Sequence, residues 1–299
     1  MNTHAQGSTL LDWLRQGRQV LEDGAMGTML QAAGLPPGAS PELWNVEQPD
    51  KVQAVHRGYV DAGSMIIGTN TFGGNRVRLE GHGLADRMAE LNRAGARLAR
   101  AVAPAGAVLV AGSVGPTGQM MEPLGPLSAD AATALFAQQV EALLEGGVDF
   151  ILIETMSDLA EVQAAIQGAR QVNANVLIAA TLTFDRNGRT MMGVRPQQAL
   201  EALHEQGIPI MGANCGNGPQ EIEAVMEQLA ARRPEGVYLM AQSNAGLPHD
   251  VEGKLIYDGT PAVMAAYAQR AHALGVNVIG ACCGSTPVHI AAMRTALFG

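Results

Sequence analysis

The stretch Asp149-Phe-Ile-Leu-Ile-Glu154, followed by Asp158-Leu-Ala-Glu161 and then Val176-Leu-Ile-Ala-Ala-Thr-Leu-Thr183, has the pattern of a strand, a helix and a second strand. Both strand segments are nearly continuous apolar runs, which is typical of a parallel sheet covered on both faces. Asp158 and Glu161 have the spacing of a capping box, so we expect a helix to begin there. This unit predicts an α/β fold with a parallel sheet.

The same alternation of strand and helix occurs about eight times along the chain. The expected strands are 20–23, 64–70, 107–113, 149–154, 176–183, 209–214, 236–242 and 276–281. Eight such units in 299 residues is the size of a (β/α)8 TIM barrel. A doubly wound open sheet is the alternative, but no G-x-G-x-x-G motif follows the first strand. We therefore expect one (β/α)8 barrel domain over residues 1–299, with residues 1–11 disordered, as chain ends often are.

Composition excludes several classes of function. The chain is 47% hydrophobic and 16% charged, enough to bury a large core, and its net charge of -9 provides no basic patch for nucleic acid. No apolar run approaches the roughly 20 residues needed to span a membrane. The first residues lack the pattern of a secretory signal, and three cysteines cannot all pair with one another. We expect a cytoplasmic protein that binds neither nucleic acid nor membrane.

Polar residues follow several of the expected strands. The first strand ends in Asp23-Gly-Ala-Met-Gly27, the fourth in Glu154-Thr-Met-Ser157, the sixth in Asn214-Cys215 and the eighth in Cys282-Cys283-Gly284. In a (β/α)8 barrel the carboxyl ends of all strands lie on one rim, and that rim carries the active site. These residues therefore predict a site there.

The three cysteines are the candidate metal ligands. Strands six and eight are two apart around a closed barrel, so Cys215, Cys282 and Cys283 can converge. Three cysteines without a fourth would hold Zn²⁺ with one position open to a substrate. Adjacent residues of a regular strand point to opposite sides, but Gly280 and Gly284 allow the backbone to bend. The alternative is three buried thiols that need no metal.

A zinc ion with three thiolate ligands favours one kind of chemistry. Such an electron-rich site is a poor Lewis acid for hydrolysis, but it suits a further thiol bound as thiolate. Hydrolytic zinc sites more typically use histidine, and none of the seven histidines lies directly at an expected strand end. Alkyl transfer to sulfur is the reaction that this ligand set predicts.

Three motifs resemble the signatures of the homocysteine S-methyltransferases: Asp23-Gly-Ala-Met-Gly-Thr28, Gly212-Ala-Asn-Cys215 and Gly280-Ala-Cys-Cys-Gly284. The resemblance runs from about Leu21 to Leu297. The chain is similar to the homocysteine-binding domain of cobalamin-dependent methionine synthase and to stand-alone bacterial betaine-homocysteine methyltransferase-like proteins. The resemblance implies a (β/α)8 barrel whose three cysteines hold one Zn²⁺, and a homocysteine thiolate that is methylated to give methionine.

The resemblance also implies roles for the other rim residues. Asp23 and Glu154 would bind the amino group of homocysteine, and the backbone amides of Gly24, Ala25 and Met26 would bind its carboxylate. A zwitterionic amino acid needs acidic partners for its ammonium group and N–H donors for its carboxylate. Asn214, beside a ligand, would orient the cysteine or accept hydrogen bonds from the loop. Without the resemblance, a turn cap at Asp23 and a structural ion pair at Glu154 stay equally open.

Two positions depart from the family pattern. The family usually has two glycines before the paired cysteines, and here the second is Ala281, which is tolerable if that position avoids positive φ. Animal-type betaine enzymes carry an aromatic residue after the Thr-Phe of the second strand end, where this chain has Gly73-Gly74. The corrinoid-using relatives also have small residues there.

The methyl donor is therefore expected to be a methylated corrinoid, with methylcobalamin supplied by a separate corrinoid protein. The chain would then be the homocysteine component of a split methionine synthase. The alternative is a small onium donor such as glycine betaine or S-methylmethionine, whose cationic head would need an aromatic face. Trp44 and Phe72 are the aromatic residues expected near the rim. A third reading, of another class, is a non-catalytic zinc-binding or thiol-binding barrel subunit.

Overall fold

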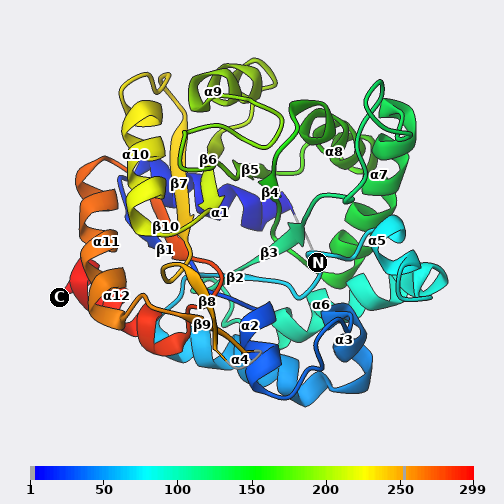
Figure 1. The fold of residues 1–299 in the computed structure, drawn as a ribbon, viewed down its shortest axis with the longest axis horizontal. Helices are drawn as coiled ribbons and strands as arrows, with labels where there is room; N and C mark the ends of the chain where they lie inside the picture. Colours follow the sequence, from blue (N-terminus) through cyan, green and yellow to red (C-terminus); the bar gives the residue numbers. More distant parts are fainter. Residues whose placement is uncertain (1–3, 252–253) are drawn as a thin grey trace.

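Eight parallel strands form a nearly closed barrel surrounded by helices (Figure 1). The computed structural model describes residues 4–251 and 254–299. The neighbour order of the strands is β1-β10-β7-β6-β5-β4-β3-β2. Their bounds are β1 (Val20–Leu21), β2 (Ile66–Gly68), β3 (Leu109–Val114), β4 (Phe150–Met156), β5 (Ile178–Leu182), β6 (Ile210–Cys215), β7 (Tyr238–Ser243) and β10 (Val278–Ala281). Each lies at one of the eight expected strands, which confirms the (β/α)8 barrel.

The barrel closes between β1 and β2. The Met65 N–H donates to the Leu21 carbonyl at 2.7 Å, and Glu22 forms an isolated parallel bridge with Ile66. These contacts continue the parallel pairing past the last residue of β1. The first and last strands of the order are therefore joined.

Helices cover the outer face of the barrel, and most of them follow a strand. The long ones are α4 (Pro49–Ala62), α6 (Met88–Val102), α7 (Ala129–Gly146), α8 (Leu159–Val172), α9 (Pro196–Glu205), α10 (Pro219–Ala230), α11 (Pro261–Ala273) and α12 (Pro287–Phe298). Shorter helical segments are α2 (Gly27–Ala32), η1 (Pro41–Leu43), α3 (Trp44–Glu47), α5 (Arg76–Glu80) and η2 (Ala85–Arg87). The main apolar core lies between the strands and these helices.

A separate apolar cluster fills the inside of the barrel. Side chains alternate along each strand, so Val20 lies in this inner cluster whereas Leu21 belongs to the outer core. Leu10, Trp13 and Leu14 join the inner cluster from helix α1 (His4–Arg15), which lies behind the strands in Figure 1. Helix α1 therefore packs against the inside of the barrel at the amino ends of the strands.

Two local expectations differ from the structure. Residues 4–11, expected to be disordered, begin helix α1, because burying its apolar face offsets the cost of ordering it; residues 1–3 lie outside the described residues. Asp158 caps α8 by accepting from the Ala160 N–H at 2.9 Å, but no capping box forms. The Glu161 side chain instead accepts from the Thr117 N–H and hydroxyl.

A two-stranded antiparallel hairpin, β8 (Pro248–Val251) and β9 (Lys254–Tyr257), lies between β7 and α11. None of the eight expected strands lies there. Strands of four residues are too short for period-2 alternation to separate them from a loop. The hairpin brings Tyr257 to the carboxyl rim, where its ring would meet any side chain placed at Gly284.

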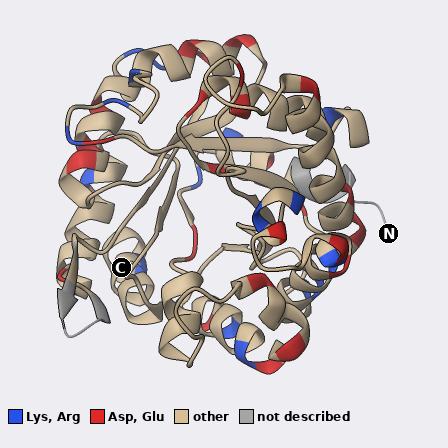
Figure 2. Cartoon of the chain, turned by 45° about the vertical axis from the view of Figure 1, so that its right-hand side comes forward, with Lys and Arg blue, Asp and Glu red and all other residues tan. Residues whose placement is uncertain are grey.

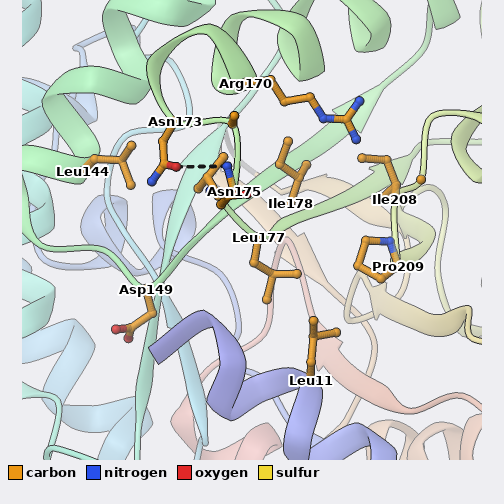
Figure 3. Close-up of a pocket in the computed structure, with 13 residues that line it drawn as sticks. Leu11, Leu144, Asp149, Arg170, Asn173, Asn175, Leu177, Ile178, Ile208 and Pro209 are labelled. Carbon is orange, nitrogen blue, oxygen red and sulfur yellow. Dashed lines mark hydrogen bonds between the residues drawn. The ribbon is translucent and has the colours of Figure 1, made fainter. Parts of the chain in front are cut away.

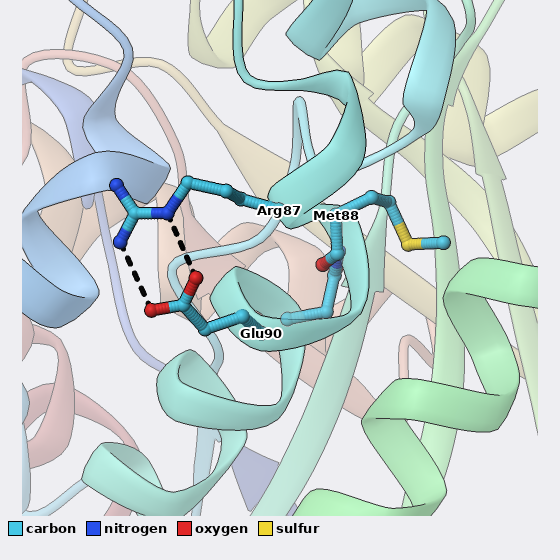
Figure 4. Close-up of polar contacts among 4 residues, drawn as sticks. Arg87, Met88 and Glu90 are labelled. Atoms are coloured by element: carbon cyan, nitrogen blue, oxygen red, sulfur yellow. Dashed lines mark hydrogen bonds and ion pairs between the residues drawn. The ribbon is translucent and has the colours of Figure 1, made fainter.

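Charged side chains are spread over the outer helices (Figure 2). At the start of α6, Arg87 donates to both carboxylate oxygens of Glu90 (Figure 4). Exposed pairs of this kind add little stability. Met88, the residue after Arg87, packs in a small cluster with Leu79 and Leu91. In the part of the chain that is described, no helix combines the length and apolar character needed to cross a bilayer.

We expect Leu10→Ala to destabilise the protein, because Leu10 is 1% exposed and fills the inner cluster. The loss should be about 2–5 kcal/mol in the free energy of unfolding, measured by urea denaturation. Gln16→Ala, at an exposed position just after α1, is the control and should change little. An unchanged stability in Leu10→Ala would show that α1 does not close the barrel.

Candidate active site

The three cysteines converge at the carboxyl rim. Cys215 ends β6, and Cys282 and Cys283 follow β10; both strands pair with β7. The sulfur atoms lie within 4.8 Å of one another, and all three cysteines are free thiols. Tetrahedral zinc, with bonds of about 2.3 Å to sulfur, would place its sulfur ligands roughly 3.8 Å apart. The cluster therefore fits such an ion with small side-chain shifts.

The backbone around the cysteines is bent in the way that this convergence requires. Cys215 has φ 64°, and Gly284 has φ 78°. Among the described residues, only Thr155 and Cys215 are non-glycine residues with positive φ. A left-handed conformation is unfavourable for a residue with a side chain and is found most often at functional sites. Ala281 does not have a positive φ, so alanine is tolerated at this position, where the family usually has glycine.

The three sulfurs share protons when no metal neutralises them. Hydrogen bonds from Cys282 and then Cys283 lower the pKa of Cys215 to about 3. The hydrogen bond to Cys215 is the largest cause that raises the pKa of Cys283 to about 12, and it also raises the pKa of Cys282. These hydrogen bonds thus favour the thiolate at Cys215 and the thiol forms at Cys282 and Cys283. Binding a metal through all three would release the remaining protons.

Glu154 stands in the interior of the mouth on a bulged strand. The pairing of β4 with β5 shifts between Ile153 and Met156, so one extra residue lies in β4 there. The Ser113 hydroxyl donates to Glu154 Oε1. Burial raises the pKa of Glu154 to about 7, with the Cys215 charge as a smaller contribution in the same direction. A bulge that redirects a side chain at a barrel rim is typical of an active site.

Asn214 is fully buried and joins β4 to β6. Its Oδ1 accepts from the Thr155 N–H at 2.8 Å and the Thr181 hydroxyl at 2.9 Å, and its Nδ2 donates to Thr155 Oγ1 at 2.7 Å. A longer contact of 3.5 Å reaches Glu154 Oε2. Asn214 thus holds Thr155 in its left-handed conformation, and its contacts are those of a positioning group.

Asp23 faces the same mouth from the end of β1. Its Oδ2 accepts from the Gly68 N–H at 2.9 Å. Its pKa is raised above the ordinary value, first by burial and also by the charge of Glu154. The two acids that the sequence singled out therefore lie within electrostatic reach of each other, with the cysteine cluster beside Glu154.

The loop after Asp23 is fixed by groups that sequence reasoning missed. The Ala25 N–H donates to Ser285 Oγ at 3.0 Å. Of the three backbone amides expected to donate to a substrate carboxylate, this one is therefore already engaged. Tyr59 donates to the Ala25 carbonyl at 2.7 Å, and Ser285 also donates to the Cys282 carbonyl at 2.7 Å. Ser285 therefore couples the Asp23 loop to the cysteine pair. Its place two residues after Cys283 was the only signal in the sequence.

The amides of Gly24 and Met26 lie on either side of Ala25, just before α2 begins. A side chain at Gly24 would come within 2.4 Å of Ser285 Oγ and 3.0 Å of the Tyr59 hydroxyl. The position therefore needs glycine for close packing. These two amides stay the candidate donors for a substrate carboxylate.

Each of the two expected aromatic rings has a cation of the protein itself near it. Trp44 is buried in the main core, with Lys51 Nζ 4.5 Å from its ring centre. Phe72 is half-buried, and the Arg78 guanidinium stands 5.8 Å from its ring centre. Two cations of the protein's own thus lie on the rings that an onium donor would use.

A cavity of about 570 Å³ lies at the opposite end of the barrel (Figure 3). Its lining includes Leu11 of α1, Asp149 just before β4 and Pro209 just before β6. Asp149 is engaged by Arg100 and by the Val110 N–H. Since barrel chemistry takes place at the carboxyl ends, this hollow is not the site.

Comparisons with known proteins identify what the chain resembles. The family model for homocysteine S-methyltransferase matches residues 20–297. Methionine synthase of Mycobacterium tuberculosis is 33% identical over 316 residues, covering 98% of this chain and 26% of that protein. The Mycobacterium leprae methionine synthase is likewise 33% identical over 318 residues. The chain spans about a quarter of the length of these two relatives.

A similar structure is the metallated form of the homocysteine methyltransferase MmuM from Escherichia coli. It superimposes with a TM-score of 0.79 at 25% identity, covering 96% of this chain and 99% of that one. The similarity therefore extends over nearly the whole chain.

We expect Glu154→Gln to raise the melting temperature of the metal-free protein at pH 8. Because its pKa rises from 4.5 to about 7 on folding, the native state keeps a proton that the unfolded chain loses. The resulting stability is fully present below pH 4.5 and is lost as pH rises through 7, where the buried charge forms. The variant should thus gain a few degrees at pH 8 and little at pH 5, by circular dichroism. Glu205→Gln, at an exposed position on α9, is the control and should show no such pH dependence. If Glu154→Gln instead had a lower melting temperature than the wild type at pH 8, this account would be wrong.

Proposed function

The chain belongs to the homocysteine S-methyltransferase family, and from this premise we propose that it methylates a zinc-bound homocysteine thiolate to give methionine. The observation that carries the proposal is the convergence of three thiols within 4.8 Å, beside two buried acids, at the carboxyl rim. Thiol ligands suit a thiol substrate, and acids suit its ammonium group.

Cys215, Cys282 and Cys283 would hold the metal. Zn²⁺ bound there would supply the charge that keeps an added thiol ionised at neutral pH. The protein's own residues place the substrate. Asp23 and Glu154 accept hydrogen bonds from its ammonium group, and the backbone amides of Gly24 and Met26 donate hydrogen bonds to its carboxylate.

Methyl transfer then needs alignment more than proton transfer. A lone pair on the homocysteine sulfur forms the new bond to the methyl carbon, while the bond between that carbon and the donor breaks and its electron pair leaves with the donor. Asn214 keeps Thr155, and with it the bulge that carries Glu154, in place. Holding the two reactants in line supplies much of the rate enhancement.

A methylated corrinoid is the donor that we propose. Exposed apolar side chains stand on the segments that follow β3, β5 and β7, namely Met120, Leu124, Met191, Leu247 and, on β9, Ile256. An apolar rim around a mouth favours a large partner over a small cation. The rings of Trp44 and Phe72 already carry Lys51 and Arg78. The methionine synthases to which the chain is similar are about four times its length, which fits a donor carried on further protein.

A small onium donor is the second candidate. The solved chain of MmuM, a homocysteine methyltransferase, is matched over 99% of its length, so that structure holds no further domain to carry a corrinoid. The non-catalytic reading has no such support, because the family is one of methyltransferases.

Cys215→Ala should lose both zinc and activity, because it leaves two sulfur ligands. Zinc is measured by atomic absorption and activity by methionine formation from homocysteine. Glu154→Ala is the matched comparison, since it should keep zinc bound and raise KM for homocysteine by roughly tenfold or more. Full turnover by Cys215→Ala would refute the zinc mechanism, and unchanged kinetics of Glu154→Ala would remove that residue from the substrate site.

The donor is tested by supplying zinc-loaded protein and homocysteine with methylcobalamin, glycine betaine or S-methylmethionine in parallel. We expect methionine to form with methylcobalamin and not with the two onium compounds. Turnover with an onium compound alone would establish the second candidate and exclude a corrinoid donor.

A further inference from the structure

Glu22 is a buried acid at the mouth that the proposed mechanism does not use. It follows β1, and its N–H donates to the Ile279 carbonyl at 2.8 Å. Because Val20 faces the barrel interior and Leu21 the outer core, strand alternation turns Glu22 inward. It therefore enters the same interior as Glu154, one residue before Asp23.

Gly280 makes room for this side chain. A Cβ at Gly280 would stand 2.9 Å from Glu22 Cβ and 3.0 Å from Glu22 Oε2. Gly280 pairs in register with Gln242 of β7. Met240 belongs to the inner cluster, so strand alternation turns the Gln242 side chain, two residues later, inward as well. The absence of a side chain at Gly280 thus opens the space between Glu22 and Gln242.

The groups that line this space have a surplus of hydrogen-bond acceptors. Glu22 is 1% exposed, and neither of its carboxyl oxygens has a hydrogen-bond partner among the described residues. The Oε1 atom of Gln242 is also buried without a partner. Burial is the largest cause that raises the pKa of Glu22, and the charges of Asp23 and Glu154 raise it further. In the described part of the chain no arginine or lysine forms an ion pair with these three acids.

A buried carboxyl group without a partner is costly unless a cation or a donor meets it. Among the described residues, only the three cysteines form a group whose possible metal-ligand atoms all lie within 4.8 Å of one another. The three acids are therefore not placed to share a metal ion. An ammonium group has three N–H donors and no acceptor, so it is the kind of group that this surplus fits.

We propose that Glu22 is a positioning residue for the substrate's ammonium group, acting with Asp23 and Glu154 to favour an amino thiol over a thiol without the amine. The proposal rests on the proposed function and extends it to substrate specificity. An ammonium group that enters the mouth favours the ionised form of Glu22, whose two unpartnered carboxyl oxygens then orient the amine.

The test is isothermal titration calorimetry of zinc-loaded protein with two probes. One is L-homocysteine, and the other is 4-sulfanylbutanoate, which has the same thiol and carboxylate but no amine. In Glu22→Gln we expect the Kd for homocysteine to rise about tenfold, the size of effect typical of one nearby charge, and the Kd for 4-sulfanylbutanoate to stay within about twofold. Glu22→Asp should keep most of the preference for homocysteine.

Glu223→Gln is the matched control, because Glu223 pairs with Arg270 on the outer helices, far from the mouth in the fold. It should bind both probes as the wild type does. If Glu22→Gln binds both probes unchanged, or both equally weakly, the inference is overturned while the proposed function stands. If the wild type binds no homocysteine at all, the proposed function fails and the inference with it.

Discussion

The site depends on the pairing of β7 with β6 on one side and with β10 on the other. Cys215 lies opposite Ser243 in the β6–β7 register, and the Cys282 N–H donates to the Ser243 carbonyl at 2.7 Å. One residue of β7 thus sets the height of both cysteine segments on the rim. Because parallel strands end on the same side, segments more than 60 residues apart in sequence meet there without any cross-link.

The second feature of the mouth is unbalanced charge. Glu22, Asp23 and Glu154 are drawn together in the interior, and the pKa of each is raised with burial as the largest cause. Such an arrangement costs stability in the free protein and is relieved when a cation enters. The geometry therefore suits a site whose acids are satisfied by the ammonium group of its substrate.

Local strain is concentrated at the two strand ends that carry chemistry. Thr155, next to Glu154, and Cys215 are the two left-handed non-glycine residues of the described chain, and Asn214 touches or adjoins both. A single buried amide thus supports an acid on β4 and a ligand on β6. Strain held in place by surrounding hydrogen bonds is a form of preorganisation.

The sequence by itself determined the eight strands, the rim and the three cysteines, because apolar runs and the residues that end them are local patterns. It also marked Asp23 and Glu154, the acids at the ends of the first and fourth expected strands. Tertiary structure alone decided that Ala25 donates to Ser285, that Trp44 is core, and that α1 packs into the amino end of the barrel. It decided the place of Glu22 as well, since only the approach of Gly280 from another strand shows why an acid fits there. These features depend on contacts between distant segments, which no local pattern encodes.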